Sequence, residues 1–217
     1  MRKSLAILFS VMMGFVFSGM GQTDISFQNE LQRSIDRGIE SLKKSQNPEG
    51  FWTNADHPAV TALVLVAYHG NPKKPKETPD WVNKGHDFML KHVQSDGSIY
   101  VPEKGLANYN TALCVMAMLA SKDAKYNPTI IKARKYLIGQ QWDLGVKGKS
   151  DHPLDGGVGY GNRFPHGDLN NTLMALEAIY YSKHLVKDSS EAKNDLNWKA
   201  AISFIQNCQN LKSHNKQ

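Results

Sequence analysis

The sequence predicts an all-α fold of seven helices with almost no strand, and three observations support this prediction. First, amphipathic and almost wholly apolar segments alternate along the chain. Second, a Gly-containing turn lies between each amphipathic segment and the apolar segment that follows it. Third, the glutamines that open these turns, Gln46, Gln94 and Gln141, are 48 and 47 residues apart. A unit of this length cannot bury an apolar helix alone, so neighbouring units are expected to stack.

The amphipathic segments are expected at 31–45, at 81–93, from Pro128 onward and at 198–209. In the first of them, Ile35, Ile39 and Leu42 share one face, and charged residues occupy the opposite face. A helix with this pattern buries one side and leaves the other in water. These segments are therefore predicted to form an outer layer.

The apolar segments are expected at 58–69, 108–121 and 169–183. Between its ends the first reads Ala-Val-Thr-Ala-Leu-Val-Leu-Val-Ala-Tyr, which leaves almost no polar face. Such a helix is buried on nearly all sides. Pro58 suits a first-turn position and Gly70 a C-terminal stop. We expect the three apolar helices to pack side by side, with 31–45 and 81–93 outside them.

The N-terminal residues 1–21 have the features of a cleaved secretory signal. Arg2 and Lys3 precede an apolar run over 5–17, and small residues follow before Gln22. A membrane-anchor helix is the alternative, but the run is short for one. We expect a secreted or periplasmic protein with no stable membrane anchor after cleavage, in which 22–217 form one domain.

Charge and cysteine content exclude other classes of protein. The formal net charge is +6, but the lysines are scattered, and no basic stripe with interleaved aromatic residues predicts nucleic-acid binding. Cys114 and Cys208 are the only cysteines, too few for a disulfide framework. We expect both to be buried thiols.

The turns carry motifs that resemble a known superfamily. They read Gln-x-x-x-Gly-x-Trp over 46–52, Gln-x-x-Gly-x-x-Tyr over 94–100 and Asp-Gly-Gly-Val-Gly-Tyr over 155–160. These resemble the Gln-Trp motifs of squalene and oxidosqualene cyclases. The stretch 155–181 also resembles the Gly-Gly repeats of protein prenyltransferase β subunits.

This resemblance implies an (α/α) toroid with inner and outer helix rings. A complete toroid has about six helix pairs, and this chain supplies about three and a half. We therefore expect a partial toroid, with the remaining half supplied by C-terminal sequence outside this chain or by a partner chain. If the ring is incomplete, the helix that carries Cys114 should expose apolar surface at the open edge.

The resemblance implies either of two functions. One is a terpene cyclase/mutase-like or transferase-like enzyme, whose apolar inner cavity holds a hydrophobic small molecule or an extended ligand. The other is a non-catalytic secreted toroid that binds a ligand or a protein. The Asp-x-Asp-Asp acid motif of the cyclases is absent, and neither cysteine has the Asp two residues upstream that the prenyltransferase zinc site requires. The sequence gives no sign of a cofactor.

The candidate catalytic residues lie in the long third turn, where inner-helix N-termini would face one rim of the cavity. They are Asp155, His166 and Asp168, close in sequence to Asp151 and His152. Histidine and carboxylate can form an acid–base pair or bind zinc, and Asp155 with Asp168 is the one pair suited to glycoside chemistry. The alternative is that they cap turns and helices.

Four aromatic residues near the turns are candidates for a ligand-binding rim: Trp52, Tyr100, Tyr160 and Phe164. Aromatic rings at such a rim can stabilise a cation or stack on a ligand. The alternative is packing between repeats.

Overall fold

The computed structural model describes residues 25–161 and 166–209. The chain divides into two compact units, with the boundary between Ser41 and Leu42. The segment 1–21, which is predicted to be a signal, lies outside the described residues. Among the helices of the described part, none has the length and apolar character needed to cross a bilayer.

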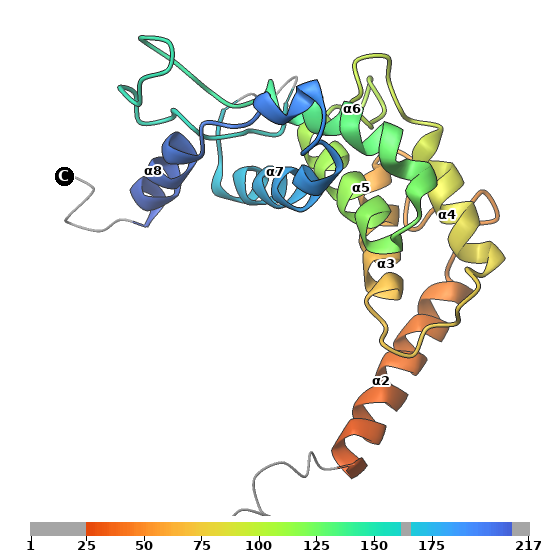
Figure 1. Cartoon of the computed structure of the whole chain (residues 1–217). Coiled ribbons are helices and arrows are strands. Elements are labelled where there is room, and N and C mark those ends of the chain that lie inside the picture. Colours follow the sequence, from red (N-terminus) through yellow and green to blue (C-terminus); the bar gives the residue numbers. More distant parts are fainter. Residues whose placement is uncertain (1–24, 162–165, 210–217) are drawn as a thin grey trace, which may run out of the picture. The chain divides into compact units, whose positions relative to one another are not determined.

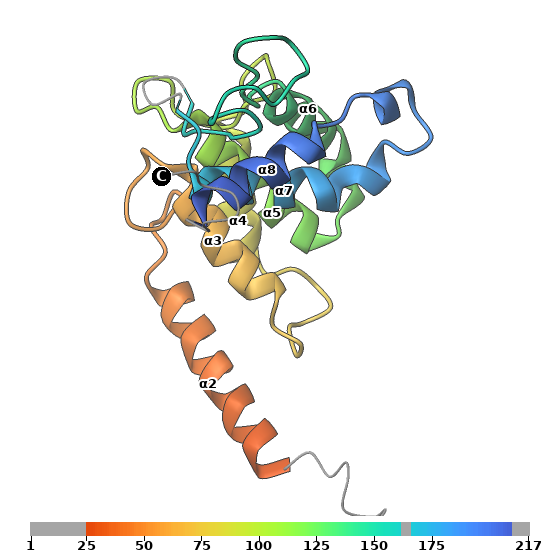
Figure 2. The same ribbon diagram turned by 90° about the vertical axis from the view of Figure 1, so that its left-hand side faces the viewer.

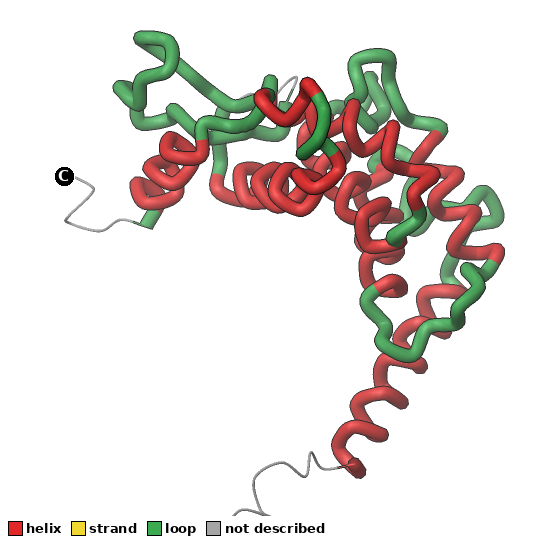
Figure 3. The backbone as a smooth tube through the Cα atoms, viewed as in Figure 1, coloured by secondary structure: helices red, strands yellow, loops and turns green. Residues whose placement is uncertain are grey.

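The described residues form an all-α structure, as predicted (Figures 1 and 3). Its seven α-helices are α2 (Ile25–Lys44), α3 (Pro58–His69), α4 (Asp80–Leu90), α5 (Ala107–Ser121), α6 (Asn127–Ile138), α7 (Leu169–Ser182) and α8 (Trp198–Cys208). Extended pairing within these residues is limited to two isolated bridges, Val93 with Ile99 and Val158 with Asp168. The predicted number of helices and the near absence of strand are confirmed for this part of the chain.

The largest difference from the predicted boundaries is at α2. This helix begins at Ile25, six residues before the predicted start at 31. No helix is predicted before residue 31, but Phe27 and Leu31 extend the apolar stripe of Ile35, Ile39 and Leu42 at helical spacing. The helix therefore continues its amphipathic pattern further toward the N-terminus.

Helices α3, α5 and α7 form a row, which we call the apolar row. Helix α5 packs against α3 on one side and against α7 on the other, and the three remain neighbours in both ribbon views (Figures 1 and 2). Ala112, Val115 and Ala117 of α5 are at most 1% exposed. The prediction that the apolar helices lie side by side is confirmed.

The amphipathic helices α4, α6 and α8 pack against this row. Helix α4 contacts α3, helix α6 contacts both α5 and α7, and helix α8 contacts α7. The buried residues of α4, which include Val82, His86 and Met89, lie on one side of that helix. The remaining predicted outer segment, 31–45, spans the boundary between the two units.

The same three contacts recur at each of the three turns. A glutamine side-chain amide donates hydrogen bonds to backbone carbonyls, the donors being Gln46, Gln94 and Gln141. A backbone N–H donates to a threonine hydroxyl of the next apolar helix, in the pairs Trp52–Thr61, Ile99–Thr111 and Val158–Thr172. A turn glycine with positive φ lies against the backbone of an amphipathic helix, in the pairs Gly50–Lys84, Gly97–Lys132 and Gly156–Ala200. The 47–48-residue sequence period thus corresponds to a recurring set of contacts.

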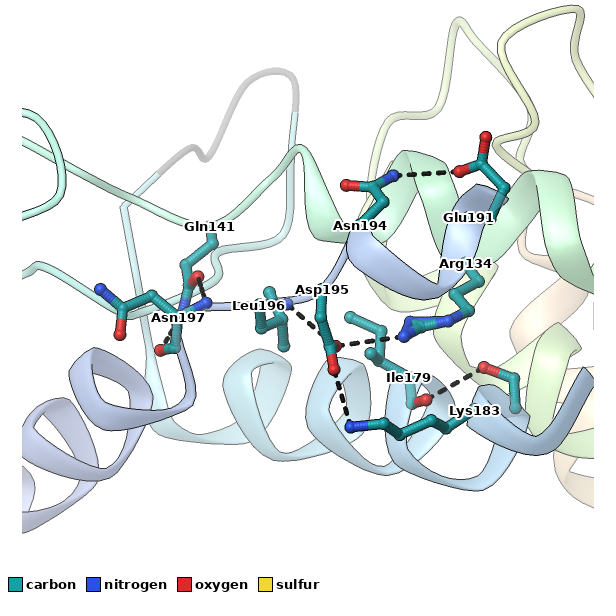
Figure 4. Close-up of polar contacts among 10 residues, drawn as sticks. Arg134, Gln141, Ile179, Lys183, Glu191, Asn194, Asp195, Leu196 and Asn197 are labelled. Atoms are coloured by element: carbon teal, nitrogen blue, oxygen red, sulfur yellow. Dashed lines mark hydrogen bonds and ion pairs between the residues drawn. The ribbon is translucent and has the colours of Figure 1, made fainter. Parts of the chain in front are cut away.

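A polar network joins α6 and Lys183, the residue that follows α7, to the segment that precedes α8 (Figure 4). Asp195 accepts hydrogen bonds from the buried Arg134 at 3.1 Å and from Lys183 at 3.0 Å. Gln141 both donates to the Asn197 carbonyl and accepts from the Asn197 N–H. Asp195 and Asn197, just before α8, are thus both held by hydrogen bonds, which fixes where the chain enters that helix.

Two expectations about cysteine and exposed surface need correction. Cys114 is buried, but Cys208 is exposed, because it occupies the last position of α8. The helix that carries Cys114 is α5, the middle member of the apolar row, so it has a neighbour on each side. Exposed apolar residues lie instead on the two flanking helices, for example Leu63 of α3 and Leu173 of α7.

Candidate binding groove and the predicted turn site

Asp155 is the most enclosed of the predicted catalytic residues. Its side chain is 3% exposed, and its two carboxylate oxygens accept hydrogen bonds from the N–H groups of Leu144, Asp151 and His152, at 2.7, 3.0 and 2.8 Å. Burial alone would raise the pKa of this carboxyl, but the three N–H donors outweigh it and lower the pKa. The carboxylate is ionised and holds the long third turn together.

Asp168 and His166 belong to the same turn, at the N-terminal end of α7. Asp168 caps this helix, accepting from the Asn171 N–H at 2.9 Å and from the Asn171 side-chain amide at 2.7 Å. Its backbone pairs with Val158, three residues after Asp155. His166 is exposed, and its ring lies 5.8 Å from that of Trp142.

The turn therefore brings the three predicted residues to one end of α7, but each carboxylate is occupied by the backbone. A cavity of about 700 Å³ lies beside the turn, and Trp142, Lys149 and Asp155 are among the residues that line it. Within the described ranges, no group of three or more His, Cys, Asp or Glu side chains is arranged to hold a metal ion.

The other polar residues near the turns also have local partners. Asp151 accepts from the Val146 N–H, and His152 accepts from the Leu154 N–H. In the first turn, Asp56 pairs with Lys104 at 3.0 Å. These contacts fit the capping and turn roles that were the alternative interpretation.

The three described residues of the predicted aromatic rim, Trp52, Tyr100 and Tyr160, lie in different surroundings. Trp52 is 3% exposed, its indole N–H donates to the Leu42 carbonyl at 2.7 Å, and its ring meets Trp81 edge-on. Tyr100 and Tyr160 are half-buried, and Tyr160 lies 5.9 Å from Tyr109 between ring centroids. Phe164 lies outside the described residues. Trp52 therefore packs within the structure, as the alternative interpretation supposed.

A second cavity lies at the opposite end of the apolar row, where the sequence motifs gave no signal. It is a groove of about 700 Å³ near the C-terminal ends of α5 and α7, and this volume lies within the ordinary range for small-molecule sites. We call it the apolar groove. Its apolar lining consists of Val66, Met116, Met118, Leu119, Ala120, Ala124, Ile130, Tyr181 and Leu185.

The apolar groove also has a few polar groups, contributed by Lys122, Asp123, Asn127 and His184. Asp123 is paired with Lys125 at 3.1 Å. His184 Nδ1 lies 2.8 Å from the Tyr181 carbonyl, which can only accept, so in the neutral ring Nδ1 carries the proton and Nε2 is an acceptor. The groove thus combines a long apolar lining with a small number of hydrogen-bonding groups.

A buried histidine pair lies between α3 and α4. The Nε2 atoms of His69 and His86 are 2.9 Å apart, and the His86 ring stacks on Tyr126 at 4.9 Å. Burial, reinforced by the positive charge of Lys74, lowers the pKa of His69 to about 4. Burial, reinforced by His69, lowers the pKa of His86 to about 3. Both rings are therefore neutral at physiological pH and share one proton in a hydrogen bond.

Comparison of the chain with protein families, with curated proteins and with solved structures finds no match.

Proposed function

We propose that this chain is a partial (α/α) toroid that binds a hydrophobic small molecule in the apolar groove. The observation that carries the proposal is the lining of the groove, in which nine apolar side chains converge from α3, α5, α6, α7 and the segments that follow α5 and α7. Sites for small apolar ligands have this composition, with a few polar groups that fix orientation.

The toroid interpretation has two supports. One is the sequence resemblance to the cyclase and prenyltransferase superfamily. The other is the threefold recurrence of the glutamine, glycine and threonine contacts, which is the pattern expected of stacked helix pairs. The N-terminal segment supports the further proposal that the protein is secreted or periplasmic.

A binding function is favoured over a catalytic one. The candidate catalytic carboxylates of Asp155 and Asp168 accept hydrogen bonds from backbone N–H groups, which suits a structural role. The groove, in contrast, has exposed apolar surface suited to a ligand.

The test is to measure the binding of a neutral apolar probe, N-phenyl-1-naphthylamine, through the change in its fluorescence. Ala120→Phe places a phenyl ring in the groove, and we expect it to weaken probe binding by about tenfold or more, since it removes contact area worth over 1 kcal/mol. The matched control is Ala192→Phe, because Ala192 is exposed and is not among the residues that line the groove. Equal probe affinity in both variants would refute the proposed function.

A further inference from the structure

The three apolar helices can be placed in a common register through their threonines. Thr61, Thr111 and Thr172 accept the equivalent N–H from the preceding turn. Since each residue turns an α-helix by about 100°, positions −3, +1, +4 and +8 from the threonine share one face, which we call the leading face. Positions −1, +3 and +6 lie on the opposite side, which we call the trailing face.

The leading face is covered on α3 and α5 but open on α7. At position +1, Ala62 is 0% and Ala112 is 1% exposed, whereas Leu173 is 40% exposed. Of the other leading positions of α7, Leu169 is 43% and Tyr180 is 63% exposed, and Leu176 is half-buried. This is the side on which α3 meets α5 and α5 meets α7, and within the described residues no further helix of the row covers it on α7.

The trailing face shows the reverse pattern. At position +6, Ala117 and Ala178 are 0% exposed, whereas Ala67 of α3 is exposed. At position +3, Cys114 is fully buried while Val64 of α3 is only half-buried. Among the described helices of 42–217, none of the apolar row therefore covers α3 on the side where α5 and α7 each have a neighbour.

Helix α8 is consistent with a missing helix beside α7. Helix α6 packs against two members of the apolar row, α5 and α7. Helix α8 makes the equivalent glycine contact, between Gly156 and Ala200, and packs against α7. Its Ile202 is nevertheless 55% exposed. A further apolar helix beside α7 would give α8 the second partner that α6 has.

We propose that the open faces pair with each other between two copies of this chain, so that the leading face of α7 in one copy packs against the trailing face of α3 in the next. This contact would continue the apolar row, because it repeats the helix-on-helix interface that the chain already forms twice, between α3 and α5 and between α5 and α7. The two faces also fit in size and charge. Large uncharged residues on α7 (Leu169, Leu173, Tyr180) meet small uncharged ones on α3 (Val60, Val64, Ala67).

Such a contact is heterologous, since different surfaces of the two copies meet. A heterologous contact closes into a ring or continues as an open chain of copies. In either arrangement the apolar row continues across the junction, and the exposed leucines and tyrosine of α7 become buried.

The first experiment is sedimentation equilibrium of the full chain with two matched variants. We expect assemblies whose mass is a multiple of 24.2 kDa. Leu173→Asp should raise the dissociation constant about 100-fold or more, because it buries an unpaired carboxylate. Val146→Asp should leave it unchanged, since Val146 is an exposed apolar residue that lies in a loop and not on α7. A monomer at every concentration, or association that survives Leu173→Asp, would overturn the proposal.

The second experiment tests which faces meet, by disulfide formation in a Cys208→Ser background. A mixture of Leu173→Cys chains and Val64→Cys chains should form a cross-linked dimer on mild oxidation. Leu173→Cys chains alone should not, because a head-to-tail contact keeps two leading faces apart. Cross-linking of Leu173→Cys with itself and not with Val64→Cys would show a symmetric interface and contradict the proposal.

Discussion

At the scale of single residues, the buried His69–His86 pair is the feature from which a pH dependence follows. The two rings are 7% and 1% exposed, and their Nε2 atoms form one hydrogen bond. A neutral pair satisfies this bond, because one ring donates and the other accepts. A doubly protonated pair cannot, since both facing nitrogens would then be donors.

The pair predicts a loss of stability in mild acid. Both histidines have a folded pKa below the ordinary 6.5, at about 4 and about 3. Below pH 6.5 the unfolded chain binds protons that the folded chain does not, so the free energy of unfolding falls as the pH falls from 6.5 toward 4. The loss is at most about 1.4 kcal/mol per pH unit for each histidine.

The measurement is urea unfolding at pH 7 and pH 5 for the wild type, His86→Phe and the control His184→Phe, whose histidine is exposed. His86→Phe should keep the stacking on Tyr126 and reduce the difference in stability between the two pH values. His184→Phe should leave that difference as in the wild type. A pH dependence that His86→Phe does not reduce would show that the pair is not its source.

At the scale of elements, the turn glycines fix how each amphipathic helix sits on the preceding turn. Gly97 has φ +92°, and a methyl group added there would lie 2.6 Å from the Lys132 carbonyl oxygen. Gly105 has φ +73°, but an added methyl group would meet no atom within 4 Å. A substitution at Gly105 therefore reports backbone strain alone, whereas the same substitution at Gly97 reports strain and close packing together.

We expect Gly97→Ala to destabilise the protein more than Gly105→Ala does. Both substitutions place a side chain at positive φ, which costs about 1 kcal/mol. Gly97→Ala adds a clash with helical backbone, which costs about 1–3 kcal/mol more. Thermal or urea unfolding of both variants measures the difference. Equal losses of stability would mean that the turn does not pack against α6 as described.

Helical periodicity was enough to predict most of the elements, but not every end. The predicted start and end of 58–69 coincide with α3, because Pro58 and Gly70 mark both ends. The start of α2 was predicted too late. Its first turns include exposed residues such as Phe27, so no buried face marks the helix there. Cys208 was predicted to be buried because free cysteines generally are, but it is exposed at the last position of α8.

The candidate site was harder to predict than the fold. Sequence motifs pointed to the Gly-rich turn, where the structure shows Asp155 and Asp168 bonded to backbone N–H groups. The apolar groove has no motif, because its lining comes from separate stretches of the chain that contribute Val66, Met116 and Tyr181. Only tertiary packing brings these residues together, so periodicity in one segment could not reveal them.

At the scale of the whole molecule, the account depends on the apolar row and on the groove at its C-terminal ends. The NMR signals of methionine methyl groups can report on the groove, because two methionines of the row helix α5 line it. Met116 and Met118 line the groove, and Met89 is buried in α4, outside the groove lining. A ligand in the groove should therefore change the environment of the first two methyl groups and leave the third unchanged.

The most direct measurement is a methyl NMR titration of the full chain, labelled at methionine, with N-phenyl-1-naphthylamine. The account predicts saturable shifts of the Met116 and Met118 signals, no shift of Met89, and loss of the Met116 shift in Ala120→Phe. Shifts confined to other methionines, or no saturable shift at Met116, would contradict the proposal that the apolar groove is a binding site.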